Sequence, residues 1–350
     1  MKNPKLVRLI ALAGAAVMAL SAVETFAGDE IMISRTFKKG SKVYIEHDIT
    51  IDQKVSGSPM GDIEAKVHRL NGLWEKVISD SPEKRKVELV FDRSLYNVQS
   101  PMFQAVFDTD DPLYEDADPQ IRTILENVVG GSMVMEIDGS GEVTEFSGMD
   151  EIAKKIEEKA VMNMHWQQMR QEFTNESAAT HWGKGRMMLY PNRKVKVGDT
   201  WTGHTEENHP MLGTMVTDHE YKLKEIREDN GKKHAIIGVT TKVSRKPSET
   251  DGPGAAPKVT GSATGEAIFD ASKGMVTNVD NTAKLQISFA IPNMPEDTPP
   301  MRINMEVSNV TTILTEKQRQ EQVAEAAKVT AERRKAEEED EEDEEDEEDE

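Results

Sequence analysis

The sequence predicts a mainly β (α+β) fold in which a curved antiparallel sheet, or half-barrel, wraps around a central helix. Three observations predict it. Apolar and polar residues alternate over long segments, residues that favour turns separate these segments, and a long helical segment lies between two sets of them. Alternation with a period of two places the apolar residues on one face of a strand, which is typical of an antiparallel sheet with one buried face.

The alternation is clearest from Val43 to Val55, where the aliphatic residues all occupy odd positions. Residues that tolerate turn conformations follow later strands, as at Asp80-Ser81-Pro82 and Asp229-Asn230-Gly231. We therefore expect about ten strands. The same alternation returns in five further segments: 63–67, 87–91, 235–239, 283–289 and 301–307.

The predicted β-rich domain, residues 28–314, divides into halves at about 37–148 and 185–314. A strand, turn and strand near residues 74–93 resemble those near 221–242. Two repeated β-meander halves would explain this likeness, although any two hairpins share features of this kind.

A helix is predicted over residues 149–175, joining the two halves, and its apolar residues form two stripes. A surface helix needs only one apolar stripe, so this helix either lies between two surfaces or bends near residues 161–165. The sequence leaves open whether the helix is a removable plug or a fixed part of the core. The second stripe consists of large apolar residues spaced four, three and four apart: Met162, Trp166, Met169 and Phe173.

The first 27 residues are typical of a secretory signal peptide. A basic start is followed by an apolar run from Leu9 to Ala22, and Thr25-Phe26-Ala27 places small residues before a cleavage site at Gly28. We expect an exported protein in the periplasm or outside the cell. No later apolar stretch approaches the roughly 20 residues that span a bilayer, so no transmembrane segment is expected.

The C-terminus is predicted to form a helix over residues 315–336 and a disordered acidic tail over 337–350. Thr315 and Gln318 form a capping box at the start of the helix. The tail is a run of fourteen acidic residues in a chain of net charge −21, and its charges repel one another. It keeps the protein soluble, attracts a basic partner protein of the cell envelope, or captures calcium weakly, since a disordered chain lacks the preformed oxygen cage of a tight calcium site. This acidity disfavours nucleic acid as a partner.

No catalytic motif stands out, and we expect neither an enzyme nor a cofactor. The chain has no cysteine, which excludes cysteine catalysis and thiolate metal sites. His204 and His209 flank Glu206 and Glu207, which leaves a metal-dependent hydrolase as an alternative, although the HExxH spacing is absent. The 19 methionines could bind copper(I), fill the core or line an apolar pocket.

One local pattern is more specific than the rest. It begins with Tyr190-Pro191, continues through Val195 to Trp201, and includes Phe269-Asp270 and Gly274. On these residues the chain, from about Phe37 to Leu314, resembles a family of exported bacterial β-rich proteins that is catalogued only as a domain of unknown function. That resemblance implies no chemistry. In architecture the predicted fold is distantly similar to the periplasmic lipoprotein carriers, whose curved half-barrel holds lipid, but function does not follow from fold.

These observations favour non-enzymatic binding of a lipid or another apolar ligand or partner in the cell envelope. Apolar pockets with a few polar groups at the mouth are the usual form of such sites. The four residues of the second stripe are the expected ligand-binding residues, and no metal site is expected. The alternative is a structural or interaction protein of the envelope that uses its C-terminal helix and acidic tail.

Overall fold

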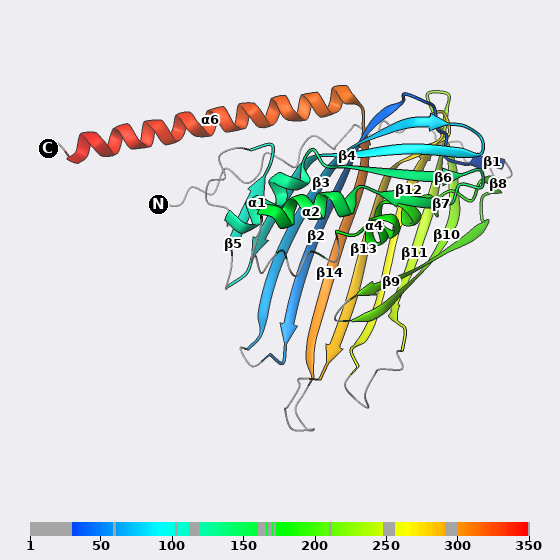
Figure 1. Ribbon diagram of the computed structural model, residues 1–350, viewed down its shortest axis with the longest axis horizontal. Coiled ribbons are helices and arrows are strands. Elements are labelled where there is room, and N and C mark those ends of the chain that lie inside the picture. The colour runs from blue at the N-terminus through cyan, green and yellow to red at the C-terminus, as the bar shows by residue number, and fades with distance from the viewer. Residues whose placement is uncertain are drawn as a thin grey trace.

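The computed structural model describes residues 30–58, 61–101, 104–111, 119–159, 166, 170, 173–209, 212–247, 256–290 and 300–348. The expected signal peptide, 1–27, lies outside these residues. Twelve antiparallel strands form one large open sheet (Figure 1). Its strands are β2 (Lys42–Ser56), β3 (Ile63–Asp80), β4 (Lys84–Gln99), β5 (Gln104–Asp108), β6 (Ser132–Asp138), β7 (Val143–Ser147), β9 (Thr200–His209), β10 (Gly213–Asp229), β11 (Lys232–Arg245), β12 (Lys258–Asp270), β13 (Met275–Phe289) and β14 (Met301–Leu314).

The strand order is β7-β6-β4-β3-β2-β14-β13-β12-β11-β10-β9, with β5 paired to β4. The two halves of the chain are therefore two meanders, and β14 joins them by pairing with both β13 and β2. The two outermost strands, β7 and β9, are not paired with each other, so the sheet is open. The prediction of a mainly β, antiparallel fold is confirmed. A separate ribbon pairs β1 (Glu30–Ile33) with β8 (Arg193–Lys196).

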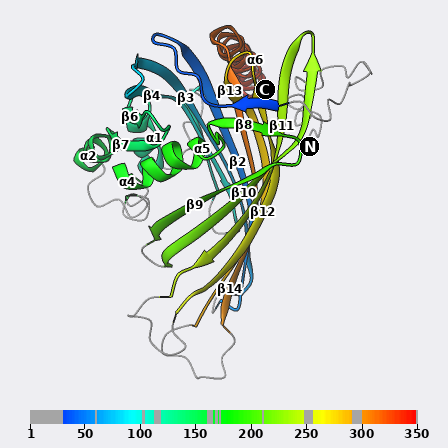
Figure 2. The ribbon, with the colours of Figure 1, turned by 90° about the vertical axis from the view of Figure 1, so that its right-hand side faces the viewer.

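Short helices lie on one face of the sheet near its upper end (Figure 2). They are α1 (Pro119–Val128), α2 (Met149–Lys159), α4 (Asn175–Ala178), the π-helical turn η2 (Ala179–Lys184) and α5 (Gly185–Met187). The prediction of one helix over 149–175 is wrong at its C-terminal end. Phe173 and Thr174 are not helical, because the Thr174 side chain accepts a hydrogen bond from the Ser177 amide and so caps a new helix.

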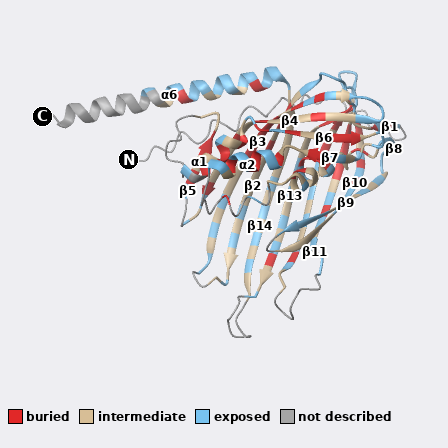
Figure 3. Ribbon diagram, in the orientation of Figure 1, coloured by how far each residue is buried: buried red, intermediate tan, exposed pale blue. Residues whose placement is uncertain are grey.

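We call the face that carries these helices the inner face. On β2 and β3 it is the face of the odd-numbered residues, because Ile45 and Leu73 pack against the helix layer. A second core cluster lies under the β1–β8 ribbon and is centred on Leu223, Ile237 and Phe269. Both clusters lie at the upper end of the sheet, where the buried residues gather in Figure 3.

The last helix, α6 (Glu316–Glu348), projects from the upper end of the sheet (Figure 1). Its predicted end was residue 336, with disorder over 337–350, but the described helix continues almost to the end of the acidic run. Carboxylates at i and i+4 repel each other along that run, which destabilises a helix there. The disorder of residues 337–350 in solution therefore stays a prediction. No helix among the described residues is long and apolar enough to cross a membrane.

Candidate functional site

Below the helices, the inner face of the sheet stays mainly apolar, with Gln53 of β2 as a polar residue within it. Strand register places Ile51 directly opposite Val67 on one side and Val307 on the other, and Val55 directly opposite Ile303. We call this surface the lower inner face. Its residues come from six neighbouring strands: Ile51, Val55, Ile63, Val67, Val98, Val259, Ala263, Ala283, Leu285, Ile287, Ile303, Met305 and Val307.

None of these residues belongs to the core clusters formed by the described part of the chain. Most of them are half-buried, as expected for side chains that have neighbours in the sheet but no helix on top. From Ile51 to Val55 a strand rises about 13 Å, and six strands span about 24 Å, which gives roughly 310 Å². This area lies at the lower end of the range for the largest apolar patch of a typical monomer, and such patches are often functional.

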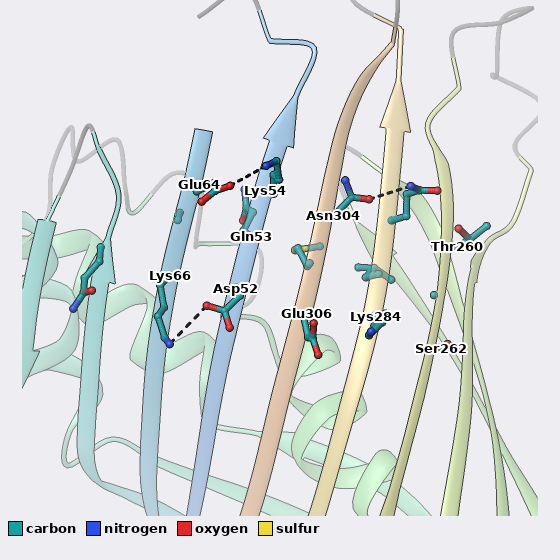
Figure 4. A pocket seen from close by; sticks show the side chains of 16 residues that line it. Asp52, Gln53, Lys54, Glu64, Lys66, Thr260, Ser262, Lys284, Asn304 and Glu306 are labelled. Atoms are coloured by element: carbon teal, nitrogen blue, oxygen red, sulfur yellow. Dashed lines mark hydrogen bonds and ion pairs between the residues drawn. The ribbon is translucent and has the colours of Figure 1, made fainter. Parts of the chain in front are cut away.

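The opposite, outer face carries an open hollow of about 960 Å³ (Figure 4). Ion pairs cross it between strands, with Lys54 Nζ 2.9 Å from Glu64 Oε1 and Lys66 Nζ 3.8 Å from Asp52 Oδ1. Lys284 and Glu306 lie directly opposite each other on β13 and β14. Charges of both signs balance here, so this face is suited to water. The lower inner face, in contrast, has no charged residue among those that define it.

A cavity of about 370 Å³ lies between the helix layer and the inner face, just above the lower inner face. Ile49 of β2 lines it, two residues before Ile51. The rest of its lining is apolar and aromatic on the helix side and mixed on the sheet side: Arg69, Asn71, Phe91, Ser94, Leu95, Tyr96, Leu125, Val128, Met149, Phe173, Ser177, Ala178, His181, Trp182, Glu207, His209 and Met215. An apolar cavity with a few polar groups is the usual form of a ligand site.

Two neutral imidazoles lie beneath the helix layer, and one of them, that of His181, lines this cavity. The ring of His47 lies 5.4 Å from the rings of both His181 and Trp182, measured between centroids. Burial, together with His181, lowers the pKa of His47 to about 3. Burial also lowers the pKa of His181, although Glu207 opposes the shift. Both side chains are therefore uncharged at pH 7.

The structure describes two of the four residues predicted to bind ligand. Trp166 is 4% exposed in the core cluster under the helices, and its ring centroid lies 5.2 Å from that of Phe173. Phe173 is half-buried and lines the cavity. Met162 and Met169 lie outside the described residues. A ligand-binding role for these four side chains stays a prediction.

Sequence reasoning missed the sheet residues of the site. Their signal was present at one end of β2, β3 and β14, where the odd positions, such as Ile51, Val67 and Val307, are mostly apolar.

The histidines considered for a metal site do not come together. His204 lies on the outer face, where its Nδ1 is 2.8 Å from Asp218 Oδ1, whereas His209 lines the cavity on the inner face. Within the described ranges, no group of three or more histidine, aspartate or glutamate residues is placed to hold a metal ion. The sequence spacing of these residues therefore does not translate into a common site.

Comparison with solved structures gives only distant similarities. The chain is similar to a structure of lipovitellin solved to show lipid–protein interactions, with a TM-score of 0.41, 9% identity, and coverage of 80% of this chain and 26% of that one. The chain thus spans about a quarter of lipovitellin's length. The β domain of the Bordetella autotransporter BrkA (TM-score 0.23, 8% identity, 77% and 98% coverage) and an outer membrane channel from Pseudomonas putida F1 (0.22, 8%, 83% and 100%) are more distant. At these TM-scores none of the likenesses supports a functional argument.

Sequence comparison gives the family. No curated protein matches the chain. Residues 83–276, more than half of the chain, match the family model described as a family of unknown function, DUF6263. This confirms the resemblance inferred from Tyr190-Pro191 and the residues that follow, most of which lie within the matched range. The chain therefore belongs to the DUF6263 family.

Proposed function

We propose that this protein binds lipid without catalysis, with the acyl chains of the lipid lying on the lower inner face and in the cavity above it. The observation that carries the proposal is a mainly apolar sheet face of about 310 Å² that no described helix covers. At about 25 cal/mol per Å², covering it would gain about 8 kcal/mol before the costs of association.

The dimensions of the face favour acyl chains over a protein helix as the occupant. Its depth, about 13 Å along the strands, is close to that of one leaflet of a bilayer, which is about half of the 30 Å hydrocarbon core. It is also lined with small and branched aliphatic side chains, such as Ala263, Ala283 and Val307, and has no aromatic residue or charge at its centre. The expected export to the cell envelope would bring the protein to a source of such lipids.

Native mass spectrometry of the mature protein, purified from an envelope fraction without detergent, tests the proposal. We expect additional mass in the range of a lipid, and the bare polypeptide mass alone would contradict it. A pair of variants on β14 locates the site, because Val307 lies on the inner face and its neighbour Ser308 lies on the outer face.

Val307→Glu should weaken binding of a fluorescent phospholipid analogue at least tenfold, since the new carboxylate must lose its water when the chain covers it. Ser308→Glu adds the same charge to the same strand and should leave binding unchanged. Equal effects of the two substitutions would show that the lower inner face is not the site.

A second candidate function rests on α6. This helix projects from the sheet and carries most of the acidic run, so a basic envelope protein could bind it through charge (Figure 1). Deletion of residues 337–350 should then abolish co-purification of such a partner, and unchanged partners would contradict the idea.

A further inference from the structure

Side chains of opposite charge line the cavity between the helix layer and the inner face. Arg69 of β3 and Glu207 of β9 come from strands that are far apart in the sheet, yet both line this one cavity of about 370 Å³. The sheet curves so that β9 reaches towards the helices (Figure 2), and the Ser177 hydroxyl of α4 donates to Glu207 Oε1 at 2.8 Å. A cation and an anion therefore border the same space.

The cation lies at the upper border of the lower inner face. Arg69 is directly opposite Tyr96 of β4, and its guanidinium lies 5.2 Å from the centroid of the Tyr96 ring. The next inner-face residues below them are Val67 and Val98, which belong to the lower inner face. Arg69 is half-buried, and a guanidinium has five N–H donors in one plane. It can therefore donate to two oxygens of a phosphate while it lies against the ring.

The anion lies at the rim of the cavity. Glu207 is exposed on the outermost strand, where the Ser177 hydroxyl orients its carboxylate. Its charge also acts on the interior, because burial lowers the pKa of His181 in the cavity lining and Glu207 opposes this shift. A carboxylate accepts up to about four hydrogen bonds, so Glu207 can also accept one from an ammonium group.

The two charges select a headgroup that carries both signs. A phosphodiester has one negative charge and fits the guanidinium of Arg69, and an ammonium group fits the carboxylate of Glu207. A headgroup with a negative charge alone is repelled by Glu207, and one with a positive charge alone is repelled by Arg69. A neutral headgroup takes water from both charges without replacing it.

The volume of the cavity is suited to a headgroup and the start of its chains. Pockets for drug-sized ligands measure about 300–1,000 Å³, and this cavity lies near the lower end of that range. The acyl chains of a phospholipid therefore need the apolar surfaces beside the two charges. These are the lower inner face, which begins two residues below Arg69, and the aromatic lining on the helix side, formed by Phe173 and Trp182.

We propose that Arg69 and Glu207 form the headgroup site for a zwitterionic phospholipid with a primary ammonium group, such as phosphatidylethanolamine. Arg69 donates to the phosphate, Glu207 accepts from the ammonium group, and acyl chain follows the inner face past Val67 and Val98. This inference rests on the proposed lipid binding and adds the class of lipid.

Competition against a fluorescent phospholipid analogue, measured on the delipidated full-length mature protein, tests the headgroup site. Phosphatidylethanolamine should bind at least fivefold more tightly than phosphatidylglycerol with the same acyl chains, because the latter has only the negative charge. Equal affinities would overturn the headgroup site and leave lipid binding intact. Absence of binding by both lipids would instead contradict the proposed function itself.

Phosphatidylcholine tests the hydrogen bond to Glu207, because it keeps both charges but its ammonium group has no N–H donor. It should bind at least threefold more weakly than phosphatidylethanolamine. Equal affinities of these two lipids would overturn the selection of a primary ammonium group.

Two neighbouring glutamates of β9 provide matched variants. Glu207→Lys replaces the anion of the cavity by a cation and should reverse the preference, so that phosphatidylglycerol binds more tightly than phosphatidylethanolamine. Glu206→Lys makes the same change on the outer face, where Glu206 Oε2 lies 3.2 Å from Lys246 Nζ, and should keep the preference of the wild type. An unchanged preference in Glu207→Lys, or a reversal in both variants, would overturn the role of Glu207.

A diacylglycerol with the same acyl chains tests Arg69, because it has no phosphate. Arg69→Gln should weaken binding of phosphatidylethanolamine at least tenfold and leave that of diacylglycerol within twofold, which also shows that the variant is folded. Arg302→Gln removes the same charge from the exposed outer face of β14 and should change neither affinity. Equal losses for the two lipids in Arg69→Gln would show that Arg69 supports the sheet and does not bind phosphate.

Discussion

The two halves of the sheet are the same kind of meander with different covers. In the N-terminal half, Leu89 and Phe91 of β4 are buried under α2 and η2. In the C-terminal half, Leu223 and Ile237 are as deeply buried, but their cover is the β1–β8 ribbon and Tyr190. Helices thus bury the inner-face residues of the N-terminal half, and a two-stranded ribbon buries those of the C-terminal half.

The difference shows that alternation and burial are separate properties of a strand. Ile45 and Ile51 occupy the same face of β2, yet Ile45 is 1% exposed under the helices and Ile51 is only half-buried below them. Alternation assigns a residue to the inner face, whereas burial requires a cover. Most residues of the lower inner face have the first property and lack the second, whereas Val98, Val259 and Ile287 are buried.

The two covers meet at Glu75. Arg35 follows β1 of the ribbon, Arg186 belongs to α5 of the helix layer, and both pair with this one carboxylate on β3. Burial would raise the pKa of Glu75, but the two arginines lower it to about 2. Glu75 therefore links the cover of one half to the cover of the other.

The largest expected effect comes from Glu75→Gln. Removal of the charge leaves Arg35 and Arg186 without their shared partner, and breaking a buried ion pair costs about 3–5 kcal/mol. Chemical denaturation should show this loss with both the fluorescence of Trp182, under the helices, and that of Trp201, which packs against the C-terminal core. Glu306→Gln on the outer face should cost less than about 0.5 kcal/mol. If the fluorescence of only one tryptophan reported the loss of stability, Glu75 would stabilise only the half that contains this tryptophan and would not link the two covers.

The contrast between local and long-range information explains what the sequence could predict. The position of side chains on β2 follows from a period of two, so Val43 to Val55 predicted a one-faced strand correctly. The cap at Thr174 is also local, because its hydroxyl accepts a hydrogen bond from the amide of Ser177, three residues further along the chain.

The candidate site depends on contacts that no local pattern contains. Glu75 is 40 residues from Arg35 and 111 residues from Arg186, and in the sequence it is an ordinary glutamate on a predicted strand. The lower inner face arises because β14 pairs with β2, across most of the chain. Only the arrangement of the two covers shows that no element of the described residues covers the apolar rows below them.

A smaller effect is expected on the pH dependence of stability, where one histidine from each half can be compared. His47 lies under the helices with a pKa of about 3, well below its ordinary value of 6.5, so the unfolded chain takes up this proton first as the pH falls. Its contribution to stability is complete above pH 6.5 and is lost towards pH 3, by about 2 kcal/mol at pH 5. Burial also lowers the pKa of His219, whose ring stacks on that of Tyr221 on the same strand and whose Nδ1 lies 2.9 Å from Thr241 Oγ1.

Unfolding of the delipidated protein at pH 7 and pH 5 measures this difference. His47→Phe should remove most of the loss on acidification, and His219→Phe should remove less. His68, whose pKa is raised mainly by its hydrogen bond with Asp48, acts in the opposite sense, but it is present in every variant and cancels. A larger effect of His219→Phe would contradict the idea that the helix layer is the drier cover.

The smallest effect concerns α6, which follows the C-terminal half in sequence but is fastened to the N-terminal half. Arg319 donates from Nε to Asp92 Oδ2 at 2.9 Å and from Nη1 to Asp110 Oδ2 at 2.6 Å, and its guanidinium lies 4.9 Å from the centroid of the Tyr44 ring. Arg319→Ala should cost about 1.5 kcal/mol, because the bonds join charged groups but one partner is partly exposed.

Hydrogen exchange distinguishes detachment of α6 from a change in the sheet. The amides of Glu316 to Arg333 should lose protection in Arg319→Ala while those of β10 and β11 keep theirs. Lys317→Ala removes only an exposed pair with Glu321 and should leave α6 protected. Loss of protection in β10 and β11 would show that α6 also supports the C-terminal half. The two halves would then be linked by α6 as well as by the pairing of β14 with β2.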